Sequence, residues 1–564
     1  MKLLTLIVSL LAMGPGVYTN PILHSDYSDP DVIRVGEDFW MTSSSFNCVP
    51  GLQILHSTDL VNWEIVGAAL REGPEACWEL FGSEGAAEGA AVQHGNGVWA
   101  PCIRYHNGTY YIFWGDPDYG IFQVHTQDPR GEWSKPVLVL AGKGMIDTSP
   151  LWDDDGKVYL VHGWAGSRNG FKSMLSVCEL NRDCSGVISE QVLVFDGNKN
   201  GNSTVEGPKF YKRNGWYYIF APSGGVKTGW QLVLRSRNVY GPYEFRTVLH
   251  QGDTDIHGPH QGGWVTDTNG KDWFLHFEDR YAYGRVVHMQ PLTWLKDDWC
   301  IIGVDSNKDG IGEPVLEYEA PYASKSSNNS SADASEEAKN FGGASSEASA
   351  TADRTEKTYV SALATETDFT TAKVPLNWQW QAKPEVNWLM TDPSDGCLRL
   401  NCIKKGDGWK SLWDTPNMLL EKVVGEEMTF TSKFIFRPSY AGDRTGLVVM
   451  GRSYSSIDLC YDGKLVSIVR HNGINANSGE AETTGESMEI HRVKKEAGPF
   501  YTIYFRVKIE KGCICTFHYS YDGKKFTQLG DPFTGREGEW IGAKLGFYSI
   551  ADIKKNDGGY VEVY

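Results

Sequence analysis

Residues 100–114 read APCIRYHNGTYYIFW, which is a short apolar run, a turn at Asn107-Gly108, and a second run rich in aromatic residues. Asn-Gly between two such runs is a strong β-hairpin signal, because both residues tolerate the positive φ angles of a tight turn. Tyr, Phe, Trp and Ile also favour strands. The stretch therefore predicts a hairpin with its turn at 107–108.

The same pattern recurs four more times in the first half of the chain. The other copies are DPDVIRVGEDFWM (29–41), DTSPLWDDDGKVYLVH (147–162), EGPKFYKRNGWYYIFA (206–221) and HQGGWVTDTNGKDWFLHF (260–277). The five turn glycines are separated by 72, 48, 59 and 55 residues, and they are Gly36, Gly108, Gly156, Gly215 and Gly270. Five hairpin units at such spacings predict a five-bladed β-propeller over residues 20–322.

The rest of the chain predicts a leader, a linker and a second β-domain. Residues 1–19 combine a lysine, an apolar run and small residues, which is typical of a signal peptide on a secreted or periplasmic protein. Residues 323–357 are mostly Ser, Ala, Glu, Asn and Gly and predict a flexible low-complexity linker. Residues 358–564 predict a β-sandwich of jelly-roll or concanavalin-like type, with strand-like runs at 428–436, 500–510 and 544–550.

Composition narrows the class of ligand. The net charge of −18 argues against duplex nucleic acid, whose binding needs a basic stripe, and favours a neutral ligand. Aromatic residues make up 12% of the chain, which suits the stacking of rings on sugars and a β-rich core equally well. The 11 cysteines cannot all pair within one chain, and their spacing does not resemble a zinc site.

The propeller interpretation brings acidic residues together. The first strand of each blade lines the central channel, so the residues that open the repeats, among them Asp29, Asp147, Glu206 and His260, should meet at one mouth. Hydrolysis of a glycosidic bond needs two carboxyl groups, and a separation of about 6.5–9.5 Å gives inversion. We expect Asp31 to alternate onto the opposite strand face, away from this site.

Several stretches resemble glycoside hydrolase family 43, of the β-xylosidase and α-L-arabinofuranosidase type. They include residues 20–63, which begin NPILHSDYSDPD, followed in order by VWAPCIRYHNGTYYIFW, IDTSPLWDDDGKVYLVHGW, EGPKFYKRNGWYYIF, HQGGWV and YGRVVHMQPLTW. The second domain, with LNWQWQAKP near its start, is similar to the C-terminal sandwich of many members. The resemblance implies that Asp29 is the general base, Glu206 the general acid, and Asp147 the residue that orients the acid and modulates its pKa.

The resemblance also implies the walls of the sugar pocket. Phe46, Trp99, Ala100 and Arg285 match pocket positions of the family, although core packing or a structural ion pair would explain each of them too. In some relatives a His at the position of His260 contacts a calcium ion or water in the channel, and a hydrogen-bonded structural role is the alternative. The resemblance implies no organic cofactor. It also implies that the sandwich lends a loop to the pocket.

Two enzymatic activities and two other functions remain open at this point. The resemblance favours an inverting exo-glycosidase that releases terminal β-D-xylosyl residues from xylan or xyloglucan-type oligosaccharides. The alternative is an α-L-arabinofuranosidase on arabinose-decorated plant polysaccharides, or a bifunctional enzyme, because the two pentoses have similar shapes. A non-catalytic sugar-binding propeller would have lost one of the three carboxylates. A retaining fructosidase would open with Asn-Asp-Pro, where this chain has Ser28-Asp29-Pro30.

Overall fold

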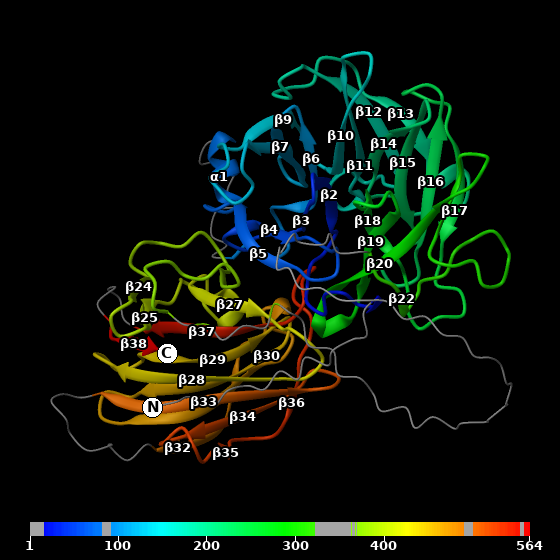
Figure 1. Ribbon diagram of the computed structural model, residues 1–564. Helices are drawn as coiled ribbons and strands as arrows, with labels where there is room; N and C mark the ends of the chain where they lie inside the picture. Colours follow the sequence, from blue (N-terminus) through cyan, green and yellow to red (C-terminus); the bar gives the residue numbers. More distant parts are fainter. Residues whose placement is uncertain are drawn as a thin grey trace, which may run out of the picture.

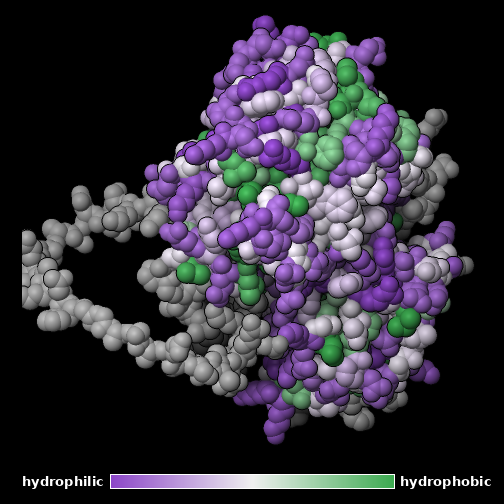
Figure 2. Space-filling view, turned by 90° about the vertical axis from the view of Figure 1, so that its right-hand side faces the viewer, coloured by the Kyte–Doolittle hydropathy of each residue, from purple (hydrophilic) through white to green (hydrophobic). Residues whose placement is uncertain are grey.

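A computed structural model of the chain describes residues 16–81, 92–321, 363, 367, 369–489, 500–552 and 558–564. It has two β-domains packed against each other, coloured from blue to green and from yellow to red in Figure 1. The expected linker, 323–357, lies outside the described residues. On the face seen in Figure 2, hydrophilic residues predominate and hydrophobic ones form separate patches.

The first domain is the predicted five-bladed propeller. Each blade is an antiparallel four-stranded sheet in sequence order, and the first strands of neighbouring blades touch, as β2 does β6 and β18. Blade 1 consists of β2 (Asp31–Val35), β3 (Asp38–Thr42), β4 (Gly51–Ser57) and β5 (Glu64–Leu70), and blade 2 of β6 (Trp99–His106), β7 (Thr109–Asp116), β8 (Gly120–Thr126) and β9 (Val137–Ala141). Blade 3 consists of β10 (Met145–Trp152), β11 (Val158–Trp164), β12 (Met174–Leu180) and β13 (Val192–Asp196), and blade 4 of β14 (Lys209–Arg213), β15 (Trp216–Ser223), β16 (Trp230–Ser236) and β17 (Glu244–Leu249). Blade 5 consists of β18 (His260–Thr266), β19 (Asp272–Asp279), β20 (Arg285–Trp294) and β21 (Cys300–Ile302).

The backbone geometry of the hairpin turns explains why the repeat can be recognised in the sequence. All five turn glycines have positive φ, between 66° and 84°. That conformation is disfavoured for residues with a Cβ atom, so glycine marks each turn. The described helices are short and lie in connections: α1 (Glu75–Trp78), η1 (Glu79–Phe81), α2 (Gly166–Asn169), η2 (Gly197–Lys199), η3 (Tyr281–Tyr283), η4 (Leu412–Asp414) and η5 (Ala476–Ser478).

The second domain is a sandwich of two eight-stranded sheets, in agreement with the concanavalin-like prediction. One sheet has the order β23-β27-β37-β29-β30-β31-β32 with β26 paired to β37, and the other has β24-β25-β38-β28-β33-β34-β35 with β36 paired to β34. The strands are β23 (Gln379–Trp380), β24 (Leu389–Asp392), β25 (Cys397–Asn401), β26 (Ile403–Lys404), β27 (Met418–Lys422), β28 (Met428–Arg437), β29 (Arg444–Met450), β30 (Tyr454–Tyr461), β31 (Val466–Gly473), β32 (Thr483–Glu489), β33 (Tyr501–Glu510), β34 (Ile514–Ser520), β35 (Thr527–Gln528), β36 (Phe533–Thr534), β37 (Lys544–Ala551) and β38 (Tyr560–Val563).

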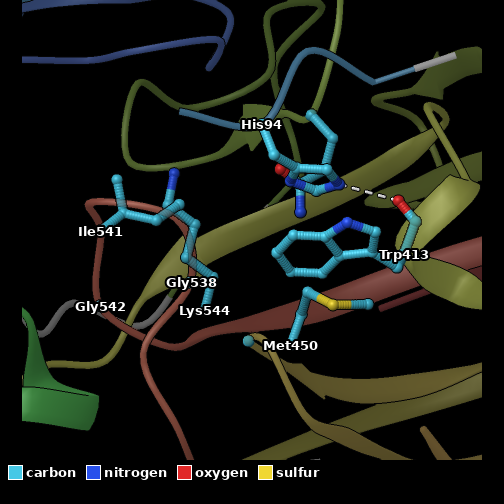
Figure 3. A pocket seen from close by; sticks show the side chains of 9 residues that line it. His94, Trp413, Met450, Gly538, Ile541, Gly542 and Lys544 are labelled. Atoms are coloured by element: carbon cyan, nitrogen blue, oxygen red, sulfur yellow. Dashed lines mark hydrogen bonds between the residues drawn. The ribbon is translucent and has the colours of Figure 1, made fainter. Parts of the chain in front are cut away.

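The two domains share a continuous interface. Val49 and Trp380 exchange backbone hydrogen bonds of 3.0 and 2.6 Å, and Tyr283 packs into the hydrophobic core of the sandwich. The His94 ring stacks on Trp413 with 3.6 Å between ring centroids. Figure 3 shows this pair beside the sandwich loop that contains residues 538–542. The sandwich is therefore fixed against the propeller by backbone pairing as well as by apolar contact.

The last residues of the expected signal peptide, 17–19, form a strand in the structure. Residues 1–15 lie outside the described residues, but β1 (Val17–Thr19) pairs with β22 (Glu317–Glu319), and Tyr18 is buried with its hydroxyl donating to the Met289 carbonyl at 2.8 Å. A leader that ended at residue 19 would include this strand. Within the described part of the chain, no helix is long and apolar enough to cross a membrane.

Candidate active site

Each blade carries a left-handed residue at the entrance to its first strand. The five residues and their φ angles are Asp29 (54°), Ala100 (34°), Asp147 (57°), Gly207 (60°) and Gln261 (37°). Positive φ costs a residue with a Cβ atom about 1–2 kcal/mol. Because an alanine and a glycine share the conformation with two aspartates, it belongs to the propeller repeat itself. Three of the inner strands also shift register at this point.

One detail of the expected alignment is wrong. We expected Glu206 and His260 to hold the same repeat position as Asp29 and Asp147, but each stands one residue earlier than the left-handed residue of its blade. The carboxylates nevertheless lie close enough for the charges of Glu206 and Asp29 to act on Asp147. The fold thus brings together three carboxylates that are far apart in sequence.

Asp29 is held by hydroxyl groups and one guanidinium. The hydroxyls of Ser28 and Ser44 donate to its Oδ2 at 2.8 and 2.5 Å, and the Arg285 Nη1 lies 3.6 Å from the same atom. Ser44 also accepts the Ala100 backbone N–H at 2.7 Å. The Asp29 side chain is only 6% exposed, so these contacts fix its direction. Arg285, one of the expected pocket residues, thus lies beside Asp29, and Ser44 is a partner that the sequence did not single out.

Asp147 is the most enclosed of the three carboxylates. Its Oδ2 accepts the Gly207 backbone N–H at 2.8 Å, and the Gln261 side-chain amide approaches the same atom at 3.5 Å. Burial, followed by the negative charges of Glu206 and Asp29, raises the pKa of Asp147 to about 8. Burial and the neighbouring negative charges therefore favour the protonated form of Asp147.

The raised pKa of Asp147 predicts a dependence of stability on pH. The folded protein binds this proton more tightly than the unfolded chain, so its contribution is complete below about pH 4 and is lost as the pH rises towards 8. Asp147→Asn keeps the shape and has no proton to lose. We expect its melting temperature, relative to the wild type, to rise between pH 5 and 8 in thermal unfolding measurements. Parallel curves for the two proteins would contradict the raised pKa.

Glu206 faces the opening of the site. Its side chain is 26% exposed, and its Oε1 lies 2.9 Å from Nε2 of the fully buried His260 side chain. The other ring nitrogen of His260 is buried without a hydrogen-bond partner. Among the described residues there is no group of three or more His, Cys, Asp and Glu that could hold a metal ion.

Two of the predicted pocket residues connect to Asp29, Arg285 directly and Ala100 through Ser44, and Phe46 and Trp99 have other contacts. Phe46 is buried and pairs with Val98 through its backbone. The Trp99 indole N–H donates to the Gly95 carbonyl at 2.7 Å, and its ring meets that of Trp540 at 6.1 Å in an edge-to-face arrangement. Trp540 belongs to the sandwich and is 45% exposed. No pattern in the sequence pointed to Trp540.

Asp31 packs between the inner strands of neighbouring blades. It is fully buried, and its Oδ2 accepts the Ile103 backbone N–H at 2.8 Å and an Arg104 guanidinium N–H at 2.7 Å. Its Oδ1 lies against Gly263 of the inner strand of blade 5. Asp31 therefore joins three inner strands beneath the site.

Comparisons with known proteins agree with this geometry. Residues 18–300 match the model of the family "Glycosyl hydrolases family 43", and residues 366–563 match "Beta xylosidase C-terminal Concanavalin A-like domain". A protein of Xylanibacter ruminicola named "Putative beta-xylosidase" is 34% identical over 94% of this chain and 86% of its own length. A "Non-reducing end alpha-L-arabinofuranosidase" of Bacteroides ovatus is 31% identical over 55% of this chain and 58% of its own.

The solved structures agree on the fold. The crystal structure of the GH43 protein BlXynB from Bacillus licheniformis covers 97% of this chain and 98% of its own, with a TM-score of 0.75 at 23% sequence identity. Both domains and their order are thus shared. The matched family models and the similar protein of Xylanibacter ruminicola, together with the shared fold, show that this chain is a glycoside hydrolase that belongs to glycosyl hydrolase family 43.

Proposed function

We propose that the chain is an inverting exo-β-D-xylosidase that acts on xylan or xyloglucan-type oligosaccharides from plant cell walls. The observation that carries this proposal is the close grouping of Asp29, Asp147 and Glu206, in which burial and the charges of the other two raise the pKa of Asp147. The name of the Xylanibacter ruminicola relative, which is similar over nearly the whole chain, supports xylose as the released sugar. The signal-peptide-like sequence of residues 1–19 supports secretion or a periplasmic location.

In the proposed mechanism the carboxylates divide the work. Asp29, fixed by two hydroxyls and Arg285, takes a proton from the attacking water. Glu206, which is more exposed and bonded to His260, gives a proton to the leaving oxygen. Asp147, buried beside the other two and hydrogen-bonded to the Gly207 backbone N–H, orients the general acid, and its raised pKa favours a shared proton in the group. All proton transfers are assigned to side chains, and no step passes through a metal ion.

An α-L-arabinofuranosidase is the second candidate, supported by the name of the Bacteroides ovatus relative. Hydrolysis of 4-nitrophenyl β-D-xylopyranoside and 4-nitrophenyl α-L-arabinofuranoside separates the two, and turnover of neither would refute a pentosidase. Proton NMR of the first sugar released identifies its anomer. An α-xylose product from the β-xyloside supports inversion, and a β-xylose product excludes it.

The loop that carries Trp540 supports a pocket for a single terminal sugar. Its ring stands edge-on to Trp99 and 5.8 Å from the Arg285 guanidinium, so the sandwich supplies one side of the opening. We expect Trp540→Ala to raise KM about 2- to 10-fold for the aryl xyloside, as the loss of one aromatic contact would.

The matched control for this variant is Tyr521→Ala. Tyr521 is 46% exposed, close to the 45% of Trp540, and it lies in a sandwich hairpin away from the propeller. Its removal should leave KM unchanged. Equal KM values for the wild type and Trp540→Ala would exclude this side of the pocket.

A further inference from the structure

Asp26 lies where the two domains meet behind the catalytic base. We call this contact, formed by Asp26, the backbone at 284–285 and the backbone at 542, the joint. Asp26 is 5% exposed. One carboxylate oxygen accepts the Arg285 backbone N–H of the propeller at 2.9 Å, and the other accepts the Gly542 backbone N–H of the sandwich at 3.1 Å. A single carboxylate therefore connects two segments from different domains that both reach the active site.

The joint is too tight for side chains. A Cβ atom on Gly284 would lie 2.4 Å from Asp26, and a Cβ atom on Gly542 would lie 2.8 Å from the Gly284 nitrogen and the Tyr283 carbonyl carbon. The next backbone bond, from Ala543 N–H to the Ala282 carbonyl at 2.7 Å, continues the contact. The sandwich loop thus rests directly on the backbone just before Arg285.

Each side of the joint leads to a group at the site. On the propeller side, the Arg285 guanidinium donates to Ser28 at 2.6 Å and lies 3.6 Å from Asp29. On the sandwich side, Gly542 follows Trp540 by two residues. A shift of the joint would displace the guanidinium that holds Asp29 and the aromatic side of the pocket together.

The surroundings of Asp26 are polar as well as tight. Asp26 and Ser44, which holds Asp29, line the same interdomain cavity of about 10 Å3, room for about one water molecule. The ammonium groups of Lys422 and Lys544 face it from the sandwich. Burial lowers the pKa of Lys422 to about 7, and the negative charge of Asp26 opposes that shift.

We propose that Asp26 is a positioning residue that couples docking of the sandwich loop to the orientation of the catalytic base through Arg285. The inference rests on the proposed role of Asp29. A neutral amide at position 26 can accept only one of the two N–H groups, so the other is left facing an NH2 group. Either Arg285 or the Trp540 loop is then displaced, and a misplacement of about 1 Å costs on the order of 100-fold in rate.

The test compares Asp26→Asn with Asp267→Asn. Asp267 is a matched control, since it is 2% exposed and accepts the Asn269 and Lys271 backbone N–H groups in a hairpin turn at the other end of blade 5. On whichever aryl pentoside the wild type hydrolyses, we expect Asp26→Asn to lower kcat about 10- to 100-fold and Asp267→Asn to leave it unchanged. Melting temperatures show whether both variants fold. Equal kcat values for the two variants would overturn the proposal.

Gly542→Ala opens the same joint and keeps Asp26 in place. We expect it to lower kcat as Asp26→Asn does, and the double variant to lose less than the product of the two single losses, because both act on one contact. Multiplicative losses would overturn the coupling. Inactive wild-type protein on both pentosides would instead refute the proposed function, so the two failures are distinct.

A pH profile separates positioning from a loss of folded enzyme. The Arg285 guanidinium lies 3.6 Å from the Asp29 carboxylate, and Lys422 lines the same cavity as Asp26. Displacement of Arg285 should move the acidic limb of kcat/KM to higher pH in Asp26→Asn. A purely structural role would lower the plateau and leave the limb in place, which would also overturn the proposal.

Discussion

Asp29→Asn should reduce kcat about 10²- to 10⁴-fold on every aryl pentoside, whatever the leaving group. The amide cannot take a proton from water, and activation of water is needed for every substrate of an inverting enzyme. The substitution keeps the size of the side chain, and Ser28, Ser44 and Arg285 continue to surround it. We expect a much smaller change in KM, which initial-rate kinetics on a series of nitrophenyl xylosides would measure.

Asp267→Asn again supplies the control, since it makes the same chemical change at a buried carboxylate that does not belong to the site. Its rates should match the wild type within about twofold. If Asp29→Asn retained more than a tenth of the wild-type kcat, or if its kcat approached the wild-type value on substrates with better leaving groups, the role of general base would have to be assigned to another residue.

The parts of the fold that could be predicted depend on local chemistry. A turn glycine between two apolar runs predicts a hairpin from a few residues, so five copies were enough to predict five blades. The expected strand runs at 428–436, 500–510 and 544–550 correspond closely to β28, β33 and β37 for the same reason. Asp29 and Asp147 could be placed because they begin copies of this repeat.

The parts that could not be predicted depend on the backbone and on domain docking. The contacts of Asp31 with the neighbouring inner strands could not be predicted, because the chain bends at Asp29, whose φ is 54°, and the alternation of β2 begins only at Asp31. The one-residue offset of Glu206 has the same origin, since the left-handed position in that blade is Gly207. Trp540 reaches the site only through the packing of the sandwich on the propeller, which no local pattern in the sequence encodes.

The loss of activity in Glu206→Gln should depend on the leaving group of the substrate, and this dependence distinguishes a general acid from a general base. A general acid is needed when the departing oxygen is a poor leaving group, as in a xylo-oligosaccharide, and is hardly needed when it is a dinitrophenolate. We expect a loss of about 10²- to 10⁴-fold in kcat/KM on xylobiose and only a small loss on 2,4-dinitrophenyl β-D-xyloside. Parallel assays of both substrates with one enzyme preparation would measure the difference.

The comparison has its own control in the same chain. Glu313→Gln changes a buried glutamate whose Oε1 accepts the Asp253 backbone N–H at 3.3 Å, outside the site, and should leave both rates unchanged. Asp29→Asn should be equally slow on both substrates. An equal loss for Glu206→Gln on the two substrates would remove it from proton donation, and Asp147, whose pKa is raised to about 8, would then be the remaining acid of the three. The ratio of the two rates therefore identifies which carboxyl group gives its proton to the leaving oxygen.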